Sequence, residues 1–240
     1  MPVTAIKNVV VVLLNVRVTA TDLAGSLPSI AAVRRLSQSY AVLDAILSAN
    51  GYVCYAFDRR WGPEEELASM TNGSGDEYSI VFARGGAFIR GFDHESLMSP
   101  YGDDGYDTWP GLIDSVPQEF AAYVTEPSFC DDVGLDHPIL AATVCLWRSR
   151  DDTAWQTGTI EYPEVRDPDG AMWLFDLLAA RTPEAYCAYA SDYFGRTVDP
   201  ADVVSVFDHQ KLTPDLVRRL NPEIGLADLA APLDTIGYGC

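Results

Sequence analysis

The chain has 240 residues, of which 48% are hydrophobic and 21% are charged, as in ordinary folded proteins and unlike disordered ones. Sixteen basic residues face 35 acidic ones, which gives a net charge of −19. That charge repels phosphate backbones and anionic lipid headgroups, so it disfavours nucleic acid and membrane surfaces as partners. No stretch approaches the roughly 18 apolar residues that a membrane span requires.

The cysteines indicate a reducing compartment. Five cysteines stand at wide spacings, the number is odd, and no C-x-x-C pair occurs, so neither a disulfide framework nor a zinc cluster is predicted. Cys54 and Cys145 lie in apolar runs and are expected to be buried, whereas Cys240 is expected to be exposed and free. We therefore expect a cytoplasmic protein.

Residues 1–24 are predicted to form an N-terminal extension. The β-branched run from Ile6 to Val18 indicates a strand, because its apolar core is too short for a signal peptide. Residues 21–26 are predicted to be a loop.

A long amphipathic helix is predicted next, starting near Ser26 with Pro28 in its first turn and ending at Asn50-Gly51. Its apolar residues recur at spacings of three and four, which places them on one stripe. These residues are Ile30, Val33, Leu36, Tyr40, Leu43, Ile46 and Leu47.

Short β-branched and aromatic runs separated by glycine turns follow the helix and predict an antiparallel meander. The strands are expected at 52–57, 67–71, 77–82 and 87–92, with one mostly apolar face that covers the long helix. Residues 93–108 are predicted to be an acidic loop.

The remaining elements are a short helix, a strand pair and a helical region. Trp109-Pro110 and Val116-Pro117 introduce the short helix, and a strand over 139–147 is expected to pair with 155–162. Helix signals dominate after Pro163. Helices are expected over Ala171–Ala180 and over 226–233. Three further helices are expected to start with a Thr or Asp cap followed by proline, at Thr182-Pro183, Asp199-Pro200 and Thr213-Pro214.

The predicted fold class is α+β, with an antiparallel sheet packed against a long N-terminal helix and followed by a helical C-terminal region. Residues 25–240 are expected to form a single domain, sheet-rich over 25–165 and helical over 166–240.

Asp93, His94 and Glu95 are the candidate catalytic residues. Their imidazole is flanked by two carboxylates directly after a strand, a combination that can bind a divalent metal or act as a general base. The alternative is an ordinary strand end with a loop hydrogen bond from His94, because adjacent strand residues point to opposite faces.

His94, Glu95, Asp103 and Asp104 are the candidate metal ligands. With Asp107, these aspartates could bind calcium, but the EF-hand spacing is missing and a solvated acidic loop is the other interpretation. Walker, G-x-G-x-x-G and G-x-S-x-G patterns do not occur, so no cofactor is expected.

The chain from about Leu27 to its end resembles an uncharacterised bacterial protein family with no assigned activity, so this resemblance implies no catalytic residues. The resemblance rests on several short motifs. They are LSQS (36–39), LDAIL (43–47), Arg60-Trp61, NGSGD (72–76), GFDHES (91–96), WQTG (155–158) and IGY (236–238).

One hairpin is also similar to SUKH-type immunity proteins. The similarity runs from Gly73-Ser74-Gly75-Asp76-Glu77-Tyr78 to Asp93-His94-Glu95, where a glycine turn leads to a strand and then to a D-H-E-like end. In SUKH proteins a Pro-containing helix precedes this hairpin, whereas here the similar segment, 109–124, follows it.

Three functions are consistent with these patterns. The leading hypothesis is a non-catalytic, acidic, cytosolic binding protein, immunity-like or regulatory, whose charge steers it to a basic partner such as a nuclease toxin. The alternatives are a metal-dependent or hydrolytic enzyme centred on His94, and a structural or oligomer-forming protein that uses the helical C-terminal part.

Overall fold

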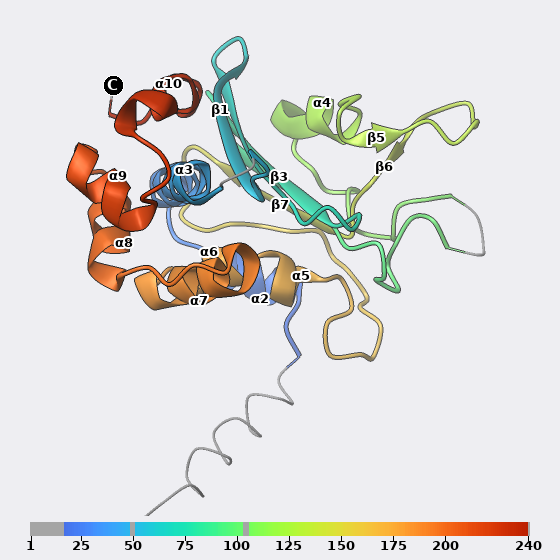
Figure 1. Cartoon of the computed structure of the whole chain (residues 1–240). Helices are drawn as coiled ribbons and strands as arrows, with labels where there is room; N and C mark the ends of the chain where they lie inside the picture. The colour runs from blue at the N-terminus through green and yellow to red at the C-terminus, as the bar shows by residue number, and fades with distance from the viewer. Residues whose placement is uncertain (1–16, 49–50, 103–105, 240) are drawn as a thin grey trace, which may run out of the picture.

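The computed structural model describes residues 17–48, 51–102 and 106–239. Its centre is an antiparallel sheet with the strand order β1-β2-β3-β4-β7, and the predicted α+β fold class is confirmed (Figure 1). The strands are β1 (Tyr55–Gly62), β2 (Glu65–Thr71), β3 (Glu77–Ala83), β4 (Gly86–Phe92) and β7 (Val144–Ser149). The predicted meander forms β1 to β4, with the first strand displaced toward the C-terminus.

Both faces of this sheet are buried. Tyr78 and Ile80 of β3 pack on one face, together with α3 (Ile30–Leu47), whereas Val81 and Phe88 belong to a second apolar cluster. The predicted apolar face covers α3 as expected, and the opposite face is buried as well, because alternate side chains of β3 and β4 enter two different cores. The molecule therefore has three layers, and the sheet is the middle one.

The second face is covered by η1 (Gln118–Phe120), α4 (Ala121–Val124), β5 (Cys130–Asp131) and β6 (Ile139–Leu140). The prediction of one strand over 139–147 was wrong, because residues 141–143 separate β6, which pairs with β5, from β7, which joins the main sheet. The expected partner strand over 155–162 is reduced to a bridge between Trp147 and Gln156.

The prediction of a loop over residues 21–26 was wrong. These residues belong to a helix, α2 (Ala20–Ser26). The Asp22 carboxylate accepts hydrogen bonds from the Thr19 backbone and hydroxyl, which fixes the first turn. The predicted strand over 6–18 lies largely outside the described residues, and Arg17 and Val18 are not in a strand.

Asp169 joins two helix starts. One oxygen of its fully buried carboxylate accepts from Ala20 N at 2.7 Å, and the other accepts from Ala171 N at 3.0 Å. Burial raises the pKa of Asp169 to about 6, against the opposing effect of these hydrogen bonds. The turn before Gly170 is thereby tied to α2.

The C-terminal region is helical, as predicted. The Pro-led starts are capped by side chains of Thr182, Asp199 and Thr213, each of which accepts a hydrogen bond from a first-turn amide. The helices are α5 (Ala171–Leu174), α6 (Asp176–Ala180), α7 (Pro183–Phe194), α8 (Pro200–Phe207), α9 (Pro214–Leu220), η2 (Leu226–Leu229) and α10 (Ala230–Ile236).

The Asp44 carboxylate links three elements inside the first core. One oxygen accepts from Cys54 N and Tyr55 N, both at 2.9 Å, and from the Tyr189 hydroxyl at 3.1 Å. The other oxygen accepts from the Tyr186 hydroxyl at 2.7 Å. Asp44 is fully buried, and this burial raises its pKa to about 6 although the hydrogen bonds oppose the shift.

We predict that Asp44→Asn lowers the free energy of unfolding by about 1–3 kcal/mol near pH 5, because the amide nitrogen that replaces one carboxyl oxygen cannot accept hydrogen bonds from the surrounding donors. Between about pH 4 and pH 6, Asp44 keeps its proton in the folded wild type and releases it in the unfolded chain. The stability that the wild type gains from Asp44 therefore falls as pH rises through this range. The loss in the variant should therefore shrink from about pH 5 to about pH 7.

Urea unfolding across this pH range measures the effect, and Asp192→Asn, an exposed position on α7, is the control. A loss that is the same at every pH would contradict the raised pKa.

Candidate functional site

His94 is held by a carboxylate from the preceding strand. The pairing of Glu77 with Phe92 brings Asp76, just before β3, beside the residues that follow β4. Asp76 Oδ1 accepts from the backbone N of His94 at 3.0 Å and lies 2.6 Å from its Nδ1. Asp76 Oδ2 accepts from Asn72 Nδ2 at 2.7 Å, so the glycine turn anchors the carboxylate.

Asp93 is held by a different set of donors. Its Oδ1 accepts from Glu95 N at 2.9 Å, and its Oδ2 accepts from Trp173 Nε1 at 3.0 Å. Gly170, at φ +77°, lies against this side chain, and a Cβ there would be 2.5 Å from Asp93 Cβ. A glycine is therefore required at residue 170 both for the backbone and for the close approach.

The structure brings two of the predicted site residues together and adds one. Asp76, Asp93 and His94 offer ligand atoms that all lie within 4.8 Å of one another. Glu95 is not part of this group, and Asp103 and Asp104 lie outside the described residues. Asp76 was not predicted, although the predicted β3–β4 hairpin carries the signal, because its register places residue 76 beside residues 93 and 94.

The Asp76–His94 pair favours an ionised carboxylate and a protonated ring. Burial opposes ionisation of Asp76, but hydrogen bonds from His94 and Asn72 outweigh it and lower the carboxyl pKa. The hydrogen bond with Asp76 raises the pKa of His94, and the Asp76, Glu95 and Asp93 charges add to this effect. Nδ1 is thus committed to Asp76, and Nε2 of the half-exposed ring is the nitrogen left for a ligand or a proton.

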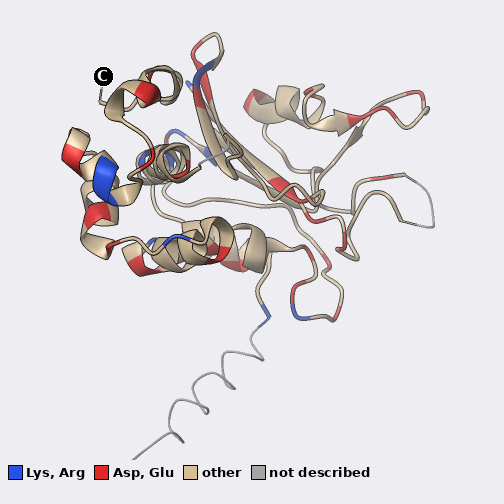
Figure 2. Ribbon diagram, viewed as in Figure 1, with Lys and Arg blue, Asp and Glu red and all other residues tan. Residues whose placement is uncertain are grey.

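Acidic residues are concentrated in the part of the chain that contains His94. Residues 91–147 contain eleven acidic residues and neither lysine nor arginine. We define the acidic loop face as the described parts of the loops 93–114, 125–138 and 157–170, where Arg166 is the single Lys or Arg (Figure 2). Its exposed carboxylates are Glu95, Asp107, Asp114, Asp131, Asp132, Asp136, Glu161 and Glu164.

These loops are joined to one another. The Tyr101 hydroxyl bonds to Asp131, the Trp109 indole donates to Glu161 O at 3.1 Å, and the Ser96 hydroxyl donates to Pro168 O at 2.6 Å. The three loops lie together on the right of Figure 1. These three contacts hold the acidic loops to one another, although the tips of the loops protrude separately in Figure 2.

The acidic loop face also carries exposed apolar side chains. Four of the seven large hydrophobic residues that are exposed in the described chain lie on it, and Leu97, the most exposed of the four, is 63% accessible. The other three are Tyr106, Leu135 and Val165. Apolar groups that gather within a polar rim are typical of protein contact surfaces.

Comparison with protein-family models gives no match, and comparisons with curated proteins and with solved structures give none either. The resemblances to the uncharacterised bacterial family and to SUKH-type proteins therefore stay predictions. Within the described ranges, no helix combines the length and the apolar composition that crossing a membrane requires.

We predict that NMR titration places the His94 imidazole pKa above the ordinary value of about 6.5. Asp76→Asn should return it toward that value, because the variant removes the charged acceptor of Nδ1. His209 is the internal control: burial lowers its pKa, and the substitution should leave it unchanged. A His94 pKa that is unaffected by Asp76→Asn would contradict the pairing.

Proposed function

We propose that the protein is a non-catalytic binding protein of the bacterial cytoplasm, immunity-like or regulatory, whose acidic loop face docks a basic protein partner. The observation that carries this proposal is the coincidence of eight exposed carboxylates with four exposed apolar side chains on connected loops. Carboxylates of one sign attract a cationic surface and orient it during encounter, and apolar groups supply the buried contact once the surfaces meet.

The His94 geometry supports binding over catalysis. All four oxygens of Asp76 and Asp93 accept hydrogen bonds from the protein, so these carboxylates are engaged in holding the loop that follows β4. The same loop is also held at the start of α5. Gly170 packs closely against the Asp93 side chain, and the Trp173 indole donates a hydrogen bond to it. The arrangement supports a rigid start for the first loop of the acidic loop face.

We predict that neutralising three face carboxylates, Glu95→Gln, Asp107→Asn and Asp136→Asn together, lowers the association rate with the partner about tenfold at low salt. The effect should fade at high salt, because ions screen exposed charges. The matched control neutralises Glu184, Asp192 and Asp208, which are exposed on or beside the C-terminal helices and change the net charge equally.

The partner is captured from cells that express the protein, with the wild type, the face variant and the control as baits, and the rate is then measured by stopped flow on the purified pair. A basic protein that is retained by the wild type and the control but lost by the face variant supports the proposal. An association rate that does not change between low and high salt excludes electrostatic steering.

A second proposal is a metal-dependent or hydrolytic role for His94, favoured by the convergence of Asp76, Asp93 and His94 within 4.8 Å. Calorimetric titration with Zn²⁺ tests it directly. Saturable binding that His94→Ala removes would support a metal site. Absence of saturable binding would leave His94 with its role in holding the loop.

A further inference from the structure

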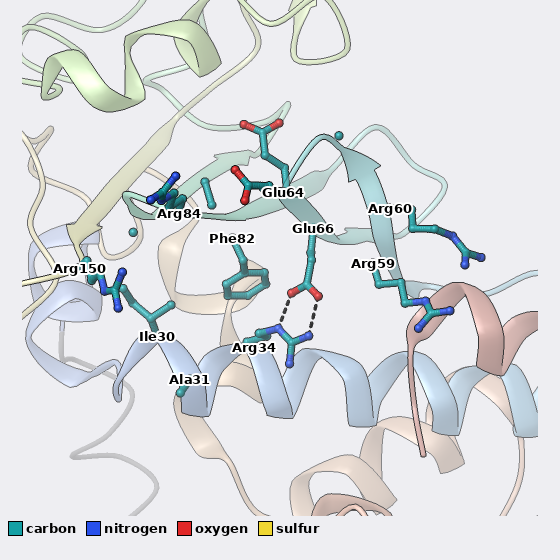
Figure 3. A pocket seen from close by; sticks show the side chains of 14 residues that line it. Ile30, Ala31, Arg34, Arg59, Arg60, Glu64, Glu66, Phe82, Arg84 and Arg150 are labelled. Atoms are coloured by element: carbon teal, nitrogen blue, oxygen red, sulfur yellow. Dashed lines mark hydrogen bonds and ion pairs between the residues drawn. The ribbon is translucent and has the colours of Figure 1, made fainter. Parts of the chain in front are cut away.

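A cavity of about 810 Å³ opens at the other end of the sheet, between the N-terminal part of α3 and the turns β1–β2 and β3–β4. Five arginines and three glutamates line it, so it concentrates positive charge in a chain of net charge −19. Figure 3 shows Arg84 and Arg150 on one side of the cavity, the Arg34–Glu66 pair in the middle, and Arg59 and Arg60 on the other side.

Half of the charged residues that line the cavity are in ion pairs. Arg34 forms a bidentate ion pair with Glu66, and Arg59 and Arg60 share the Asp234 carboxylate. Glu65 accepts a hydrogen bond from the Tyr123 hydroxyl at 2.6 Å. These contacts neutralise the middle of the cavity and engage the arginines on one side, and Arg84 and Arg150 remain on the other side.

Arg84 and Arg150 are brought together by the backbone. Arg84 lies in the β3–β4 turn, and Arg150 N donates to Gly85 O of that turn at 2.7 Å. Both residues are exposed, and neither guanidinium has a hydrogen bond or ion pair with the described parts of the chain. Both side chains line the same side of the cavity, and guanidinium groups offer the forked donors that bind the oxygens of a phosphate or a carboxylate.

The wall beside these arginines is apolar. Ile30 and Ala31 of α3 and Phe82 of β3 line it, and Figure 3 shows Ile30 and Phe82 between Arg150 and Arg34. The cavity volume lies in the range of small-molecule sites, which combine apolar walls with a few polar anchors.

Glu64 lies at the rim in an unusual conformation. It follows Pro63 in the β1–β2 turn with φ 60°, a left-handed backbone that normally selects glycine. Residues held in such conformations cluster at functional sites. Its carboxylate adds negative charge to the rim and is expected to weaken the binding of any anion there.

We propose that this cavity binds a small organic anion, an apolar body that ends in a phosphate or carboxylate group, with Arg84 and Arg150 as the anchors of the oxyanion. Phe82, Ile30 and Ala31 contact the apolar body. The site is separate from the acidic loop face and is independent of the function proposed for that face.

Phenyl phosphate and benzoate are the probes. Their binding to the whole chain is measured at low salt by ¹H–¹⁵N NMR titration. Inorganic phosphate tests the charge alone, and benzyl alcohol tests the apolar body alone. We expect saturable shifts at the cavity residues with one or both anionic aromatics, and weaker binding of each partial probe.

Arg84→Gln with Arg150→Gln should weaken this binding at least about tenfold. The control, Arg166→Gln with Arg218→Gln, removes the same charge at exposed positions elsewhere and should change little. Glu64→Gln should tighten binding about twofold or more, because it removes a like charge from the rim. Capture of the basic partner should be unaffected by the Arg84 and Arg150 substitutions, which separates this proposal from the proposed function.

Absence of saturable binding by both anionic aromatics would overturn the proposal. Equal losses in the cavity variant and in the control would also overturn it, because general charge would then explain the binding.

Discussion

The packing of α3 against β1 and α7 is organised around one buried carboxyl group. Asp44 lies near the end of α3. Its two oxygens accept hydrogen bonds from two backbone amides at the start of β1 and from two tyrosine hydroxyls of α7. A buried carboxylate is costly unless its lone pairs are satisfied, so α3, β1 and α7 are stable only in an arrangement that brings all four donors together. The first core is then filled around this point by aromatic rings, with Tyr40 stacked on Tyr186.

The excess of acidic residues has two separate roles. Asp44 and Asp169 are fully buried and act as internal acceptors, where burial raises their pKa to about 6. The carboxylates of the acidic loop face are exposed and have little basic charge beside them. Net charge alone does not distinguish these roles, because it counts a structural acceptor and a surface charge equally.

The sequence predicted the elements that depend on local signals. The meander follows from glycine turns between β-branched runs, and the C-terminal helices follow from Thr or Asp caps with proline in the first turn. Helix α2 was missed because it is only seven residues long and contains Gly25, although Asp22 marks its start. The split between β6 and β7 was missed because an apolar run does not show which of two sheets each part joins.

The sites were less predictable, because they join residues that are distant in the chain. His94 was singled out, but its partner Asp76 is 18 residues away and is brought near by strand pairing. The cavity carried no local signal, since Arg34, Arg84 and Arg150 come from a helix, a hairpin turn and the end of another strand. Such juxtapositions become visible only when the register of the sheet and the packing of α3 are known.

Strands β3 and β4 connect the two sites directly. Each has seven residues, so about 20 Å of sheet that is buried on both faces separates the arginines at one end from the loops at the other. The two proposed sites are therefore held at a fixed distance from each other. Opposite local charges at the ends of a rigid body also form an electric dipole. For the proposed basic partner, such a dipole would exert a torque as well as a pull, and the torque would turn the acidic loops toward the approaching surface.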